Sequence, residues 1–203
     1  MSIPFQDSET AKNLLRAFAG ESQARNRYDF AANLCQKQEL QAMAFIFQAT
    51  AKQEQAHAKV FWDHLQALNG QNLPIYGAYP IEGTNRVLEL LRAAQHNEHE
   101  EHGSVSPSFA AIATQEGFPE AAASFRQIAA IEQLHGERFG LLADQLESVA
   151  LFVSQIETGW MCLNCGHTQN SLEAPKQCPV CNHGQGWFIR LELAPWSPVA
   201  KQT

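Results

Sequence analysis

The sequence predicts a mainly α-helical protein, in which a four-helix bundle with one long crossover precedes a small C-terminal module that binds a metal. Three observations predict this class. Residues 8–149 are rich in Ala, Gln, Glu and Leu, which are good helix formers. A loose segment at residues 71–83 divides this region in two, and later residues change to Gly, Pro, Cys and Trp. We expect two domains, at residues 1–152 and 153–203.

The first half of the helical region predicts one helical hairpin. We expect the first helix over residues 8–37, with Ser8 as its cap. The second helix is expected over residues 39–68, where apolar residues recur with a period near 3.6 and Asn69-Gly70 ends the pattern. Residues 71–83 contain two prolines, too loose for a helix and too long for a tight turn, so they predict a crossover.

The second half predicts a second hairpin. Its first helix is expected over residues 84–116, disturbed at Gly103 and Pro107. Its second helix is expected over residues 119–148 and begins on Pro119, which suits a first helical turn.

The two hairpins also form an internal repeat. A shift of 77 residues superimposes Glu21 on Glu98. A repeat whose matched positions are Glu and His indicates a site on a pseudo-twofold axis. A shift of 78 superimposes Ala51, Glu54, Gln55, His57 and Phe61 on Ala129, Glu132, Gln133, His135 and Phe139.

The motifs Glu54-x-x-His57 and Glu132-x-x-His135 each predict half of a metal site. Side chains three residues apart lie on one helix face, so each pair can hold one ion. With one Glu from each of the other two helices, Glu21 and Glu98, this is the pattern of a bundle that binds two iron or manganese ions. A single such pair is common on solvated helix faces, but two pairs at matched positions strongly indicate a site.

Two further residues belong to the candidate site. Glu101 lies one helical turn after Glu98, and its repeat counterpart is Ala24, so we interpret it as a fifth carboxylate that makes the two metals inequivalent. Tyr28 lies two turns after Glu21 and can direct its hydroxyl toward the site. The other residues considered are expected on the surface (His64, His96, His99 and His102) or in the core (Cys35).

The pairs Cys162-x-x-Cys165 and Cys178-x-x-Cys181 predict four thiolates around one tetrahedral ion. Gly166 and Asn182 follow the two pairs and suit the left-handed turns that such hairpins require. The spacing fits iron and structural zinc equally, and the neighbouring carboxylate site favours iron. An apolar shell is expected from Trp160, Trp187 and Phe188.

Composition excludes several classes. The net charge of −7 and the absence of a Lys/Arg run argue against nucleic acid as a partner. No stretch reaches about 18 apolar residues, so we expect no membrane span. The first ten residues lack the pattern of a signal peptide, so a cytoplasmic location is expected, where thiols stay reduced.

The chain resembles members of the rubrerythrin family. The resemblance spans about residues 8–192 and includes residues 20–28, both Glu-x-x-His motifs, residues 106–110 and both cysteine pairs. It implies a ferritin-like bundle with two non-haem iron ions, followed by a rubredoxin-like domain with one iron, for which zinc is a possible substitute. It implies a peroxidase that reduces hydrogen peroxide to water in oxidative-stress defence. The electrons would come from NADH through a reductase or a small redox protein.

The resemblance also implies a ligand set. One iron would take Glu21, Glu54 and either Glu101 or His57, and the other Glu98, Glu132 and His135, with Glu54 and Glu132 bridging. Tyr28 or a bound carboxylic acid would assist proton delivery, and the chain would form a homodimer or larger homo-oligomer. The chain departs from many relatives at His102 and Ser106, where those relatives have an aromatic residue and Tyr.

Two other functions stay open on the sequence. One is a ferritin-like protein that oxidises or stores iron and has a structural zinc ribbon at its end. The other is a metal-stabilised binding module without turnover.

Overall fold

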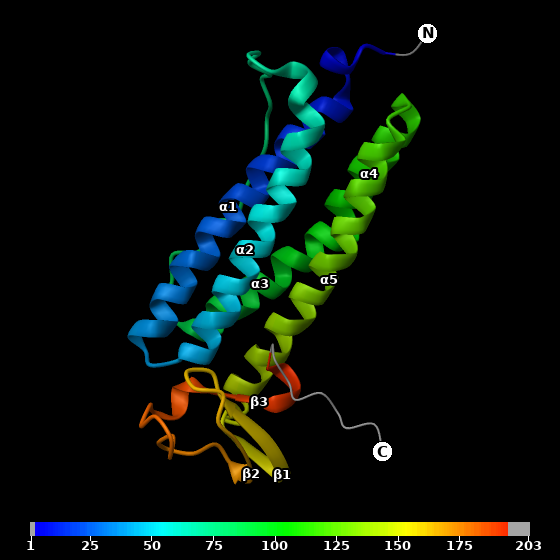
Figure 1. Ribbon diagram of the computed structural model, residues 1–203. Coiled ribbons are helices and arrows are strands. Elements are labelled where there is room, and N and C mark those ends of the chain that lie inside the picture. The colour runs from blue at the N-terminus through cyan, green and yellow to red at the C-terminus, as the bar shows by residue number, and fades with distance from the viewer. Residues whose placement is uncertain (1–2, 195–203) are drawn as a thin grey trace.

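The computed structural model describes residues 3–194 and confirms the predicted fold class (Figure 1). The helices α1 (Glu9–Lys37) and α2 (Gln41–His64) form one antiparallel hairpin. The second hairpin consists of α3 (Val87–Glu100) and α4 (Ser106–Glu116) on one side and α5 (Pro119–Glu147) on the other. The four-cysteine module lies at the end of the bundle where α5 ends (Figure 1).

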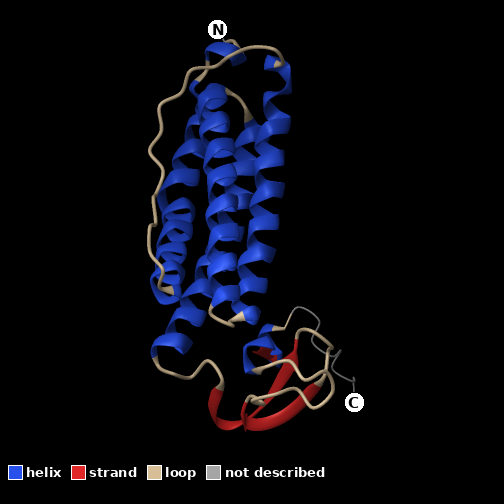
Figure 2. Ribbon diagram, turned by 90° about the vertical axis from the view of Figure 1, so that its left-hand side faces the viewer, coloured by secondary structure: helices blue, strands red, loops and turns tan. Residues whose placement is uncertain are grey.

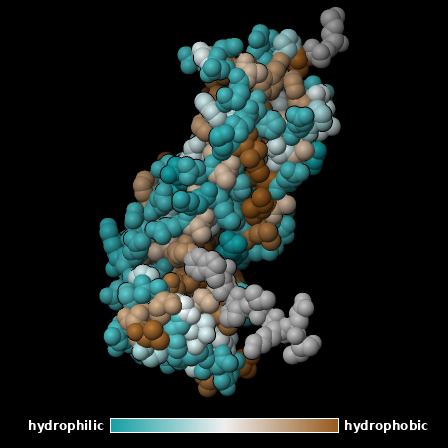
Figure 3. Space-filling model, in the orientation of Figure 1, coloured by the Kyte–Doolittle hydropathy of each residue, from teal (hydrophilic) through white to brown (hydrophobic). Residues whose placement is uncertain are grey.

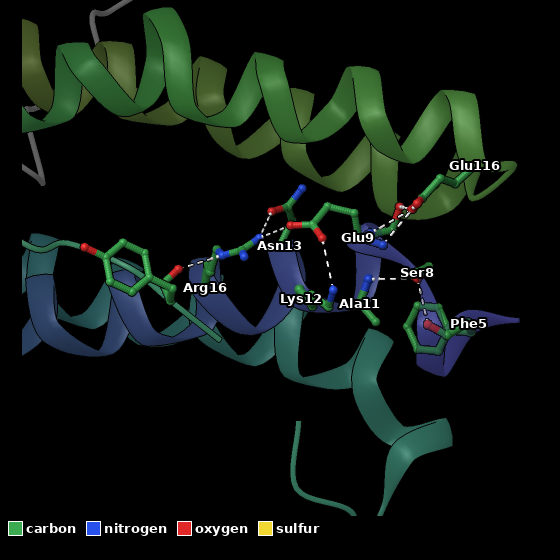
Figure 4. A network of polar contacts seen from close by, with 10 residues as sticks. Phe5, Ser8, Glu9, Ala11, Lys12, Asn13, Arg16 and Glu116 are labelled. Atoms are coloured by element: carbon green, nitrogen blue, oxygen red, sulfur yellow. Dashed lines mark hydrogen bonds and ion pairs between the residues drawn. The ribbon is translucent and has the colours of Figure 1, made fainter. Parts of the chain in front are cut away.

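The N-terminus of α1 is capped as predicted. The Ser8 hydroxyl accepts a hydrogen bond from the Ala11 amide at 3.1 Å. The carboxylate of Glu116, at the last turn of α4, accepts hydrogen bonds from the amides of Glu9 (3.0 Å) and Thr10 (2.8 Å). Figure 4 shows Glu116 reaching across to this end of α1. The first and second hairpins are therefore joined by caps at the end farthest from the cysteine module.

The predicted third helix is interrupted by a π-helical turn over Glu101–Val105. Pro107 has no amide hydrogen, and in a regular α-helix its ring would collide with the carbonyl of Gly103. A π turn contains one extra residue and removes this conflict. The helix also begins at Val87 and not at residue 84.

This turn explains why two different shifts relate the halves of the chain. Before the turn, a shift of 77 pairs buried Leu14 with buried Leu91. After the turn, a shift of 78 pairs buried Ala32 with buried Ala110. The extra residue of the second half is therefore located in the turn Glu101–Val105.

The crossover between α2 and α3 runs along the length of the bundle (Figure 2). It is attached to α1 at several points. The Tyr79 hydroxyl donates to the Arg16 carbonyl (3.0 Å), the Arg16 Nε donates to the Tyr76 carbonyl (2.9 Å), and the Gln23 side chain donates to the Pro80 carbonyl (2.6 Å). The crossover is thereby held against the face of α1.

The cysteine module contains three antiparallel strands, β1 (Val153–Cys162), β2 (Thr168–Glu173) and β3 (Phe188–Arg190), in the order β2-β1-β3. Two of its buried residues, Met161 and Ile189, belong to the same hydrophobic core as residues of α2 and α5. The module therefore packs on the bundle through a shared core.

Gly186 marks a close approach between the module and the bundle. A Cβ atom at this position would lie 1.7 Å from the carbonyl oxygen of Glu39, in the loop between α1 and α2. No side chain fits in that space, so this contact requires glycine.

The face shown in Figure 3 is mainly hydrophilic, with a band of hydrophobic side chains over α5. Exposed apolar residues on α5 include Ile131, Leu134 and Leu141. Within residues 3–194, no helix has the length and apolar character that crossing a membrane requires.

Candidate metal centres

Four helices direct acidic and imidazole side chains to one buried point in the bundle. Each side chain sits on an inward-facing stripe, and each is at most 6% exposed. The contributors are Glu21 of α1, Glu54 and His57 of α2, Glu98 of α3, and Glu132 and His135 of α5.

The six side chains form two overlapping groups. Within each group, the potential ligand atoms lie within 4.8 Å of one another. The groups share two carboxylates, as bridging ligands between two ions would. One group contains Glu21, Glu54, His57 and Glu132, and the other Glu54, Glu98, Glu132 and His135.

The two histidines occupy nearly equivalent positions. His57 Nδ1 lies 3.0 Å from Glu54 Oε2 and 2.9 Å from Glu132 Oε1. His135 Nδ1 lies 3.0 Å from Glu54 Oε1 and 2.9 Å from Glu132 Oε2. Each of the two shared carboxylates therefore presents one oxygen to each histidine, as the pseudo-twofold repeat requires.

Several of these buried atoms lie close to one another but make no hydrogen bond of acceptable geometry with any described residue. They are Glu21 Oε2, Glu54 Oε1, both carboxylate oxygens of Glu132, and His135 Nδ1. Buried polar atoms without partners are rare, because losing water without compensation costs free energy. All of them belong to the two groups, so a pair of divalent cations fits this donor set.

The pKa values of the site show the electrostatic cost of leaving it without cations. Burial and the charges of Glu54 and Glu132 raise the pKa values of Glu21 and Glu98 well above their usual range. The same causes raise the pKa of Glu101 to about 8. Several carboxylates so close together cannot all ionise without positive charge.

The pKa values of the two histidines shift in the direction opposite to the shift that burial alone would cause. Burial lowers the pKa of His57, but its close contacts with the carboxylates of Glu132 and Glu54 outweigh it and raise the pKa to about 9. The same balance, with Glu98 as a further partner, raises the pKa of His135 to about 12. Close contacts with both imidazoles, each at 2.9 Å, outweigh the burial of Glu132 and lower its pKa to about 2. In metal-free protein, imidazolium groups would balance part of the negative charge of the carboxylates.

Tyr28 and Glu101 flank the six central side chains. Tyr28 is 2% exposed, and its hydroxyl donates a hydrogen bond to Glu98 Oε1. Glu101 is half-buried in the π turn and lies outside both close groups, although its charge raises the pKa of Glu21. The sequence left Glu101 and His57 as alternatives for the same ion, and the structure places His57 in the close group.

Gln53 is a residue of the site that sequence reasoning missed. Nε2 of His135 lies 2.9 Å from the side-chain oxygen of Gln53, so Nε2 carries a proton and donates it there. This fixes the tautomer in which Nδ1 faces the carboxylates. The signal was a mismatch in the repeat, because a shift of 78 superimposes Gln53 on Ile131.

Two histidines expected on the surface are in fact half-buried. His64 Nε2 lies 2.9 Å from the Ser124 hydroxyl. His102 Nδ1 donates to the Ala129 carbonyl at 2.8 Å, because the π turn rotates this residue toward α5. His96 and His99 are exposed, as predicted. Cys35 is fully buried, and burial raises the pKa of its thiol to about 12, so it is a packed core residue.

The four C-terminal cysteines form the second centre. Their sulfur atoms lie within 4.8 Å of one another, with Cys162 to Cys181 at 3.7 Å and Cys165 to Cys178 at 3.6 Å, and all are free thiols. Such spacing suits one tetrahedral ion and is too long for a disulfide.

Both cysteine hairpins have the predicted turn. Gly166 and Asn182 adopt φ values of 76° and 61°. The backbone amide of His183 points at the Cys181 sulfur and is the largest cause that lowers the pKa of this thiol to about 5. A thiolate is thereby favoured at Cys181, whereas burial raises the pKa of Cys162 to about 12. The expected apolar shell is present, with Trp160 and Phe188 buried in the module core and Trp187 packed against them.

The fold and the two centres define a class: a ferritin-like bundle with a carboxylate-rich di-metal site, followed by a rubredoxin-like four-cysteine module. The rubrerythrin family model matches residues 12–143, and the model of the rubrerythrin rubredoxin-like domain matches residues 160–189. The chain belongs to the rubrerythrin family.

Similar proteins agree with this assignment. Rubrerythrin of Porphyromonas gingivalis is 43% identical over 188 residues, which cover 93% of this chain and 92% of the relative. Rubrerythrin of Nitratidesulfovibrio vulgaris is 39% identical over 186 residues, covering 92% and 96% of the two chains.

Solved structures share the fold. A mixed-valence nigerythrin superimposes with a TM-score of 0.60 at 23% identity, covering 91% of this chain and 90% of that one. Bacterioferritin of Mycobacterium tuberculosis superimposes with a TM-score of 0.61 at 18% identity, covering 70% and 89%.

Proposed function

We propose that this protein is a non-haem di-iron peroxidase that reduces hydrogen peroxide to water and receives electrons through a rubredoxin-type iron. One observation carries the proposal. A buried di-metal donor set, with two shared carboxylates, stands in the same chain as a four-thiolate centre. When bound, a ferrous pair supplies two electrons to the O–O bond, and a four-thiolate iron supplies single electrons that restore it.

The donor atoms suggest how the ions are held. Glu21 and His57 would bind one ion, with Glu101 of the π turn as the alternative to His57. Glu98 and His135 would bind the other, and Glu54 and Glu132, which belong to both groups, would serve both ions. The two metal positions differ in their surroundings, because Gln53 holds His135 from behind.

The chain itself supplies a proton donor close to the reacting atoms. Tyr28 is buried, and burial together with the charge of Glu98 raises the pKa of its phenol well above the usual range. The phenol therefore stays protonated and holds its proton at Glu98 Oε1. In the proposed reaction, this hydroxyl orients Glu98, and a proton that it gives to the leaving oxygen is restored from solvent at once, because a buried phenolate beside Glu98 is unfavourable.

We also propose a homodimer or larger homo-oligomer, with a reductase or small redox protein as electron donor. Two features support contacts with other molecules. Cys165 of the four-thiolate centre is exposed, which gives electrons a short route from the surface. The hydrophobic band over α5 offers an apolar surface for association (Figure 3).

The proposal is tested by anaerobic reduction of the iron-loaded protein followed by stopped-flow mixing with peroxide or oxygen. We expect the di-iron site to reoxidise much faster with peroxide than with oxygen, and the four-thiolate iron to bleach on reduction and recover. Equal rates with the two oxidants would contradict the proposal. A colourless purified protein with zinc at the cysteines would instead favour iron oxidation or storage.

A further inference from the structure

A cavity of about 230 Å³ adjoins the di-metal site. It lies between α1, the crossover and the π turn. Two of its lining residues, Glu21 and Glu101, are candidate ligands of the same ion. The remaining wall is largely apolar and includes Phe109 and Val105. The cavity therefore adjoins the metal position and has an apolar wall that a hydrocarbon group could contact.

The internal repeat explains why this space exists. After the π turn, the shift of 78 superimposes Tyr28 on Ser106. The ring of Tyr28 fills its side of the bundle and lies 5.2 Å from Phe139, and its hydroxyl satisfies Glu98. Ser106 carries no ring, and the counterpart of Glu98, Glu21, keeps an oxygen without a hydrogen-bond partner among the described residues. The cavity lies where a second tyrosine ring would fit.

The cavity is built from fixed parts. Tyr79 lines it, and the hydrogen bond from its hydroxyl to the Arg16 carbonyl holds it in place. The Arg16 guanidinium donates to Glu9 (2.5 Å) and Asn13 (2.6 Å), as Figure 4 shows. Its charge is thus largely neutralised by Glu9.

The charges around the cavity favour an uncharged ligand. Glu21 and Glu101 adjoin it, and the one nearby cation among its lining residues, Arg16, is already paired. An anion would meet carboxylates without a free positive charge. The cavity is also several times larger than the roughly 30 Å³ that a water molecule occupies in the liquid, so it has room for a ligand larger than hydrogen peroxide.

We propose that the cavity admits small organic hydroperoxides, so that the protein reduces alkyl hydroperoxides as well as hydrogen peroxide. This rests on the proposed peroxidase function. The alkyl group lies against Phe109 and Val105, and the O–O group points toward Glu21 and Glu101. Two electrons from the bound ferrous pair and two protons cleave the O–O bond, giving the alcohol and water. The external donor then returns two electrons through the four-thiolate iron.

The first test compares hydroperoxide selectivity in two variants. Ser106→Tyr places a ring in the cavity, and Ser108→Tyr places the same ring at an exposed position of α4. We expect the ratio of kcat/KM for tert-butyl hydroperoxide to that for hydrogen peroxide to fall about tenfold or more in Ser106→Tyr. Ser108→Tyr keeps the wild-type ratio. An unchanged ratio in Ser106→Tyr would overturn the proposal.

The arms of this test separate the two proposals. Wild-type protein that reduces neither compound contradicts the peroxidase function itself. Wild-type protein that reduces hydrogen peroxide but not tert-butyl hydroperoxide leaves that function standing and overturns the cavity proposal.

A binding measurement tests the proposal independently of turnover and of the Ser106→Tyr variant. Zinc-loaded wild-type protein, which is redox-inert, is titrated with tert-butyl alcohol, the product, and followed by amide NMR. We expect saturable shifts at Gly20 and Ala78, which line the cavity. In Ser106→Tyr, where it folds, these shifts are lost. Absence of saturable shifts at these residues in wild-type protein would overturn the proposal.

Discussion

Gln53 of α2 accepts a hydrogen bond from the Nε2–H of His135 on α5, across a distance of 2.9 Å. The repeat places the apolar residue Ile131 at the matching position for His57, whose contacts with Glu54 and Glu132 are made by Nδ1. One histidine is therefore fixed in tautomer and orientation, while the other is held through Nδ1. This difference lies outside the donor atoms, yet it makes the two ions inequivalent.

Removing the Gln53 side chain should weaken the binding of one ion only, the ion that His135 binds. Partners of this kind contribute about 10–100-fold in metal affinity. Gln53 is exposed, so water can partly replace it, and we expect Gln53→Ala to lose about tenfold. Competition against a chelator with Co²⁺ would measure this as weaker binding of one of two ions.

The matched control is Gln55→Ala, two residues away on the same helix and also exposed. It should leave both affinities unchanged. The converse variant, Ile131→Gln, supplies the missing partner and should tighten the His57 ion. Equal effects of Gln53→Ala on both ions would contradict this account of the asymmetry.

The metal-free protein should lose stability as pH rises. In the folded state the pKa of Glu101 is raised from 4.5 to about 8, and that of His57 from 6.5 to about 9. The folded chain then binds more protons than the unfolded chain, so the free energy of unfolding falls between about pH 4.5 and 9. Glu132, with its pKa lowered to about 2, acts in the opposite sense and lowers stability only below about pH 4.5.

Urea unfolding of the metal-free protein at pH 5, 7 and 9 measures this slope. Protein loaded with Zn²⁺ is the control and should show a much flatter dependence over the same range, because the ions replace the protons. A midpoint that rises with pH in the metal-free protein would rule out the proposed charge balance.

Replacing Tyr28 with Phe tests the proton donor. The ring still packs against Phe47 and Phe139, but Glu98 loses its hydrogen bond. We expect the free energy of unfolding to fall by about 1–2 kcal/mol. Peroxide turnover should fall about 100-fold, the low end for general acid catalysis. Calorimetry and steady-state kinetics measure the two effects.

Tyr76→Phe is the matched control, since this tyrosine is 87% exposed on the crossover. It should change neither quantity. If Tyr28→Phe lowered stability without affecting turnover, the hydroxyl would serve only to orient Glu98.

The sequence predicted the helices and the convergence of Glu and His because both follow from local periodicity. A spacing of three residues places Glu54 and His57 on one face whatever the helix packs against. The cap at Ser8 and the left-handed turns at Gly166 and Asn182 are local in the same sense. The four close sulfur atoms follow from two such hairpins.

What the sequence did not predict depends on packing between elements. The change of shift from 77 to 78 required one extra residue, but only the structure locates it at Glu101–Val105. That turn brings His102 against α5, which no helical pattern anticipates. Gln53 looks like one more polar surface residue until α5 is placed beside it.

Gly186 provides the test of how the module and the bundle are coupled. The contact between Gly186 and the Glu39 carbonyl leaves no room for a methyl group. At Gly184, two residues earlier, a Cβ atom would have no neighbour within 4 Å, and φ is an ordinary −68°. Gly186→Ala should therefore force the module away from the α1–α2 loop, and Gly184→Ala should not.

Because Met161 and Ile189 share a core with the bundle, we expect wild-type protein to unfold in one calorimetric transition.

In Gly186→Ala the shared core is disturbed, and we expect the module to unfold separately and earlier than the bundle. Retained absorption of the four-thiolate iron at low temperature would show that the module itself is still folded in that variant. A single transition at the wild-type temperature in Gly186→Ala would mean that the loop moves at little cost, and that the shared core alone couples the two parts.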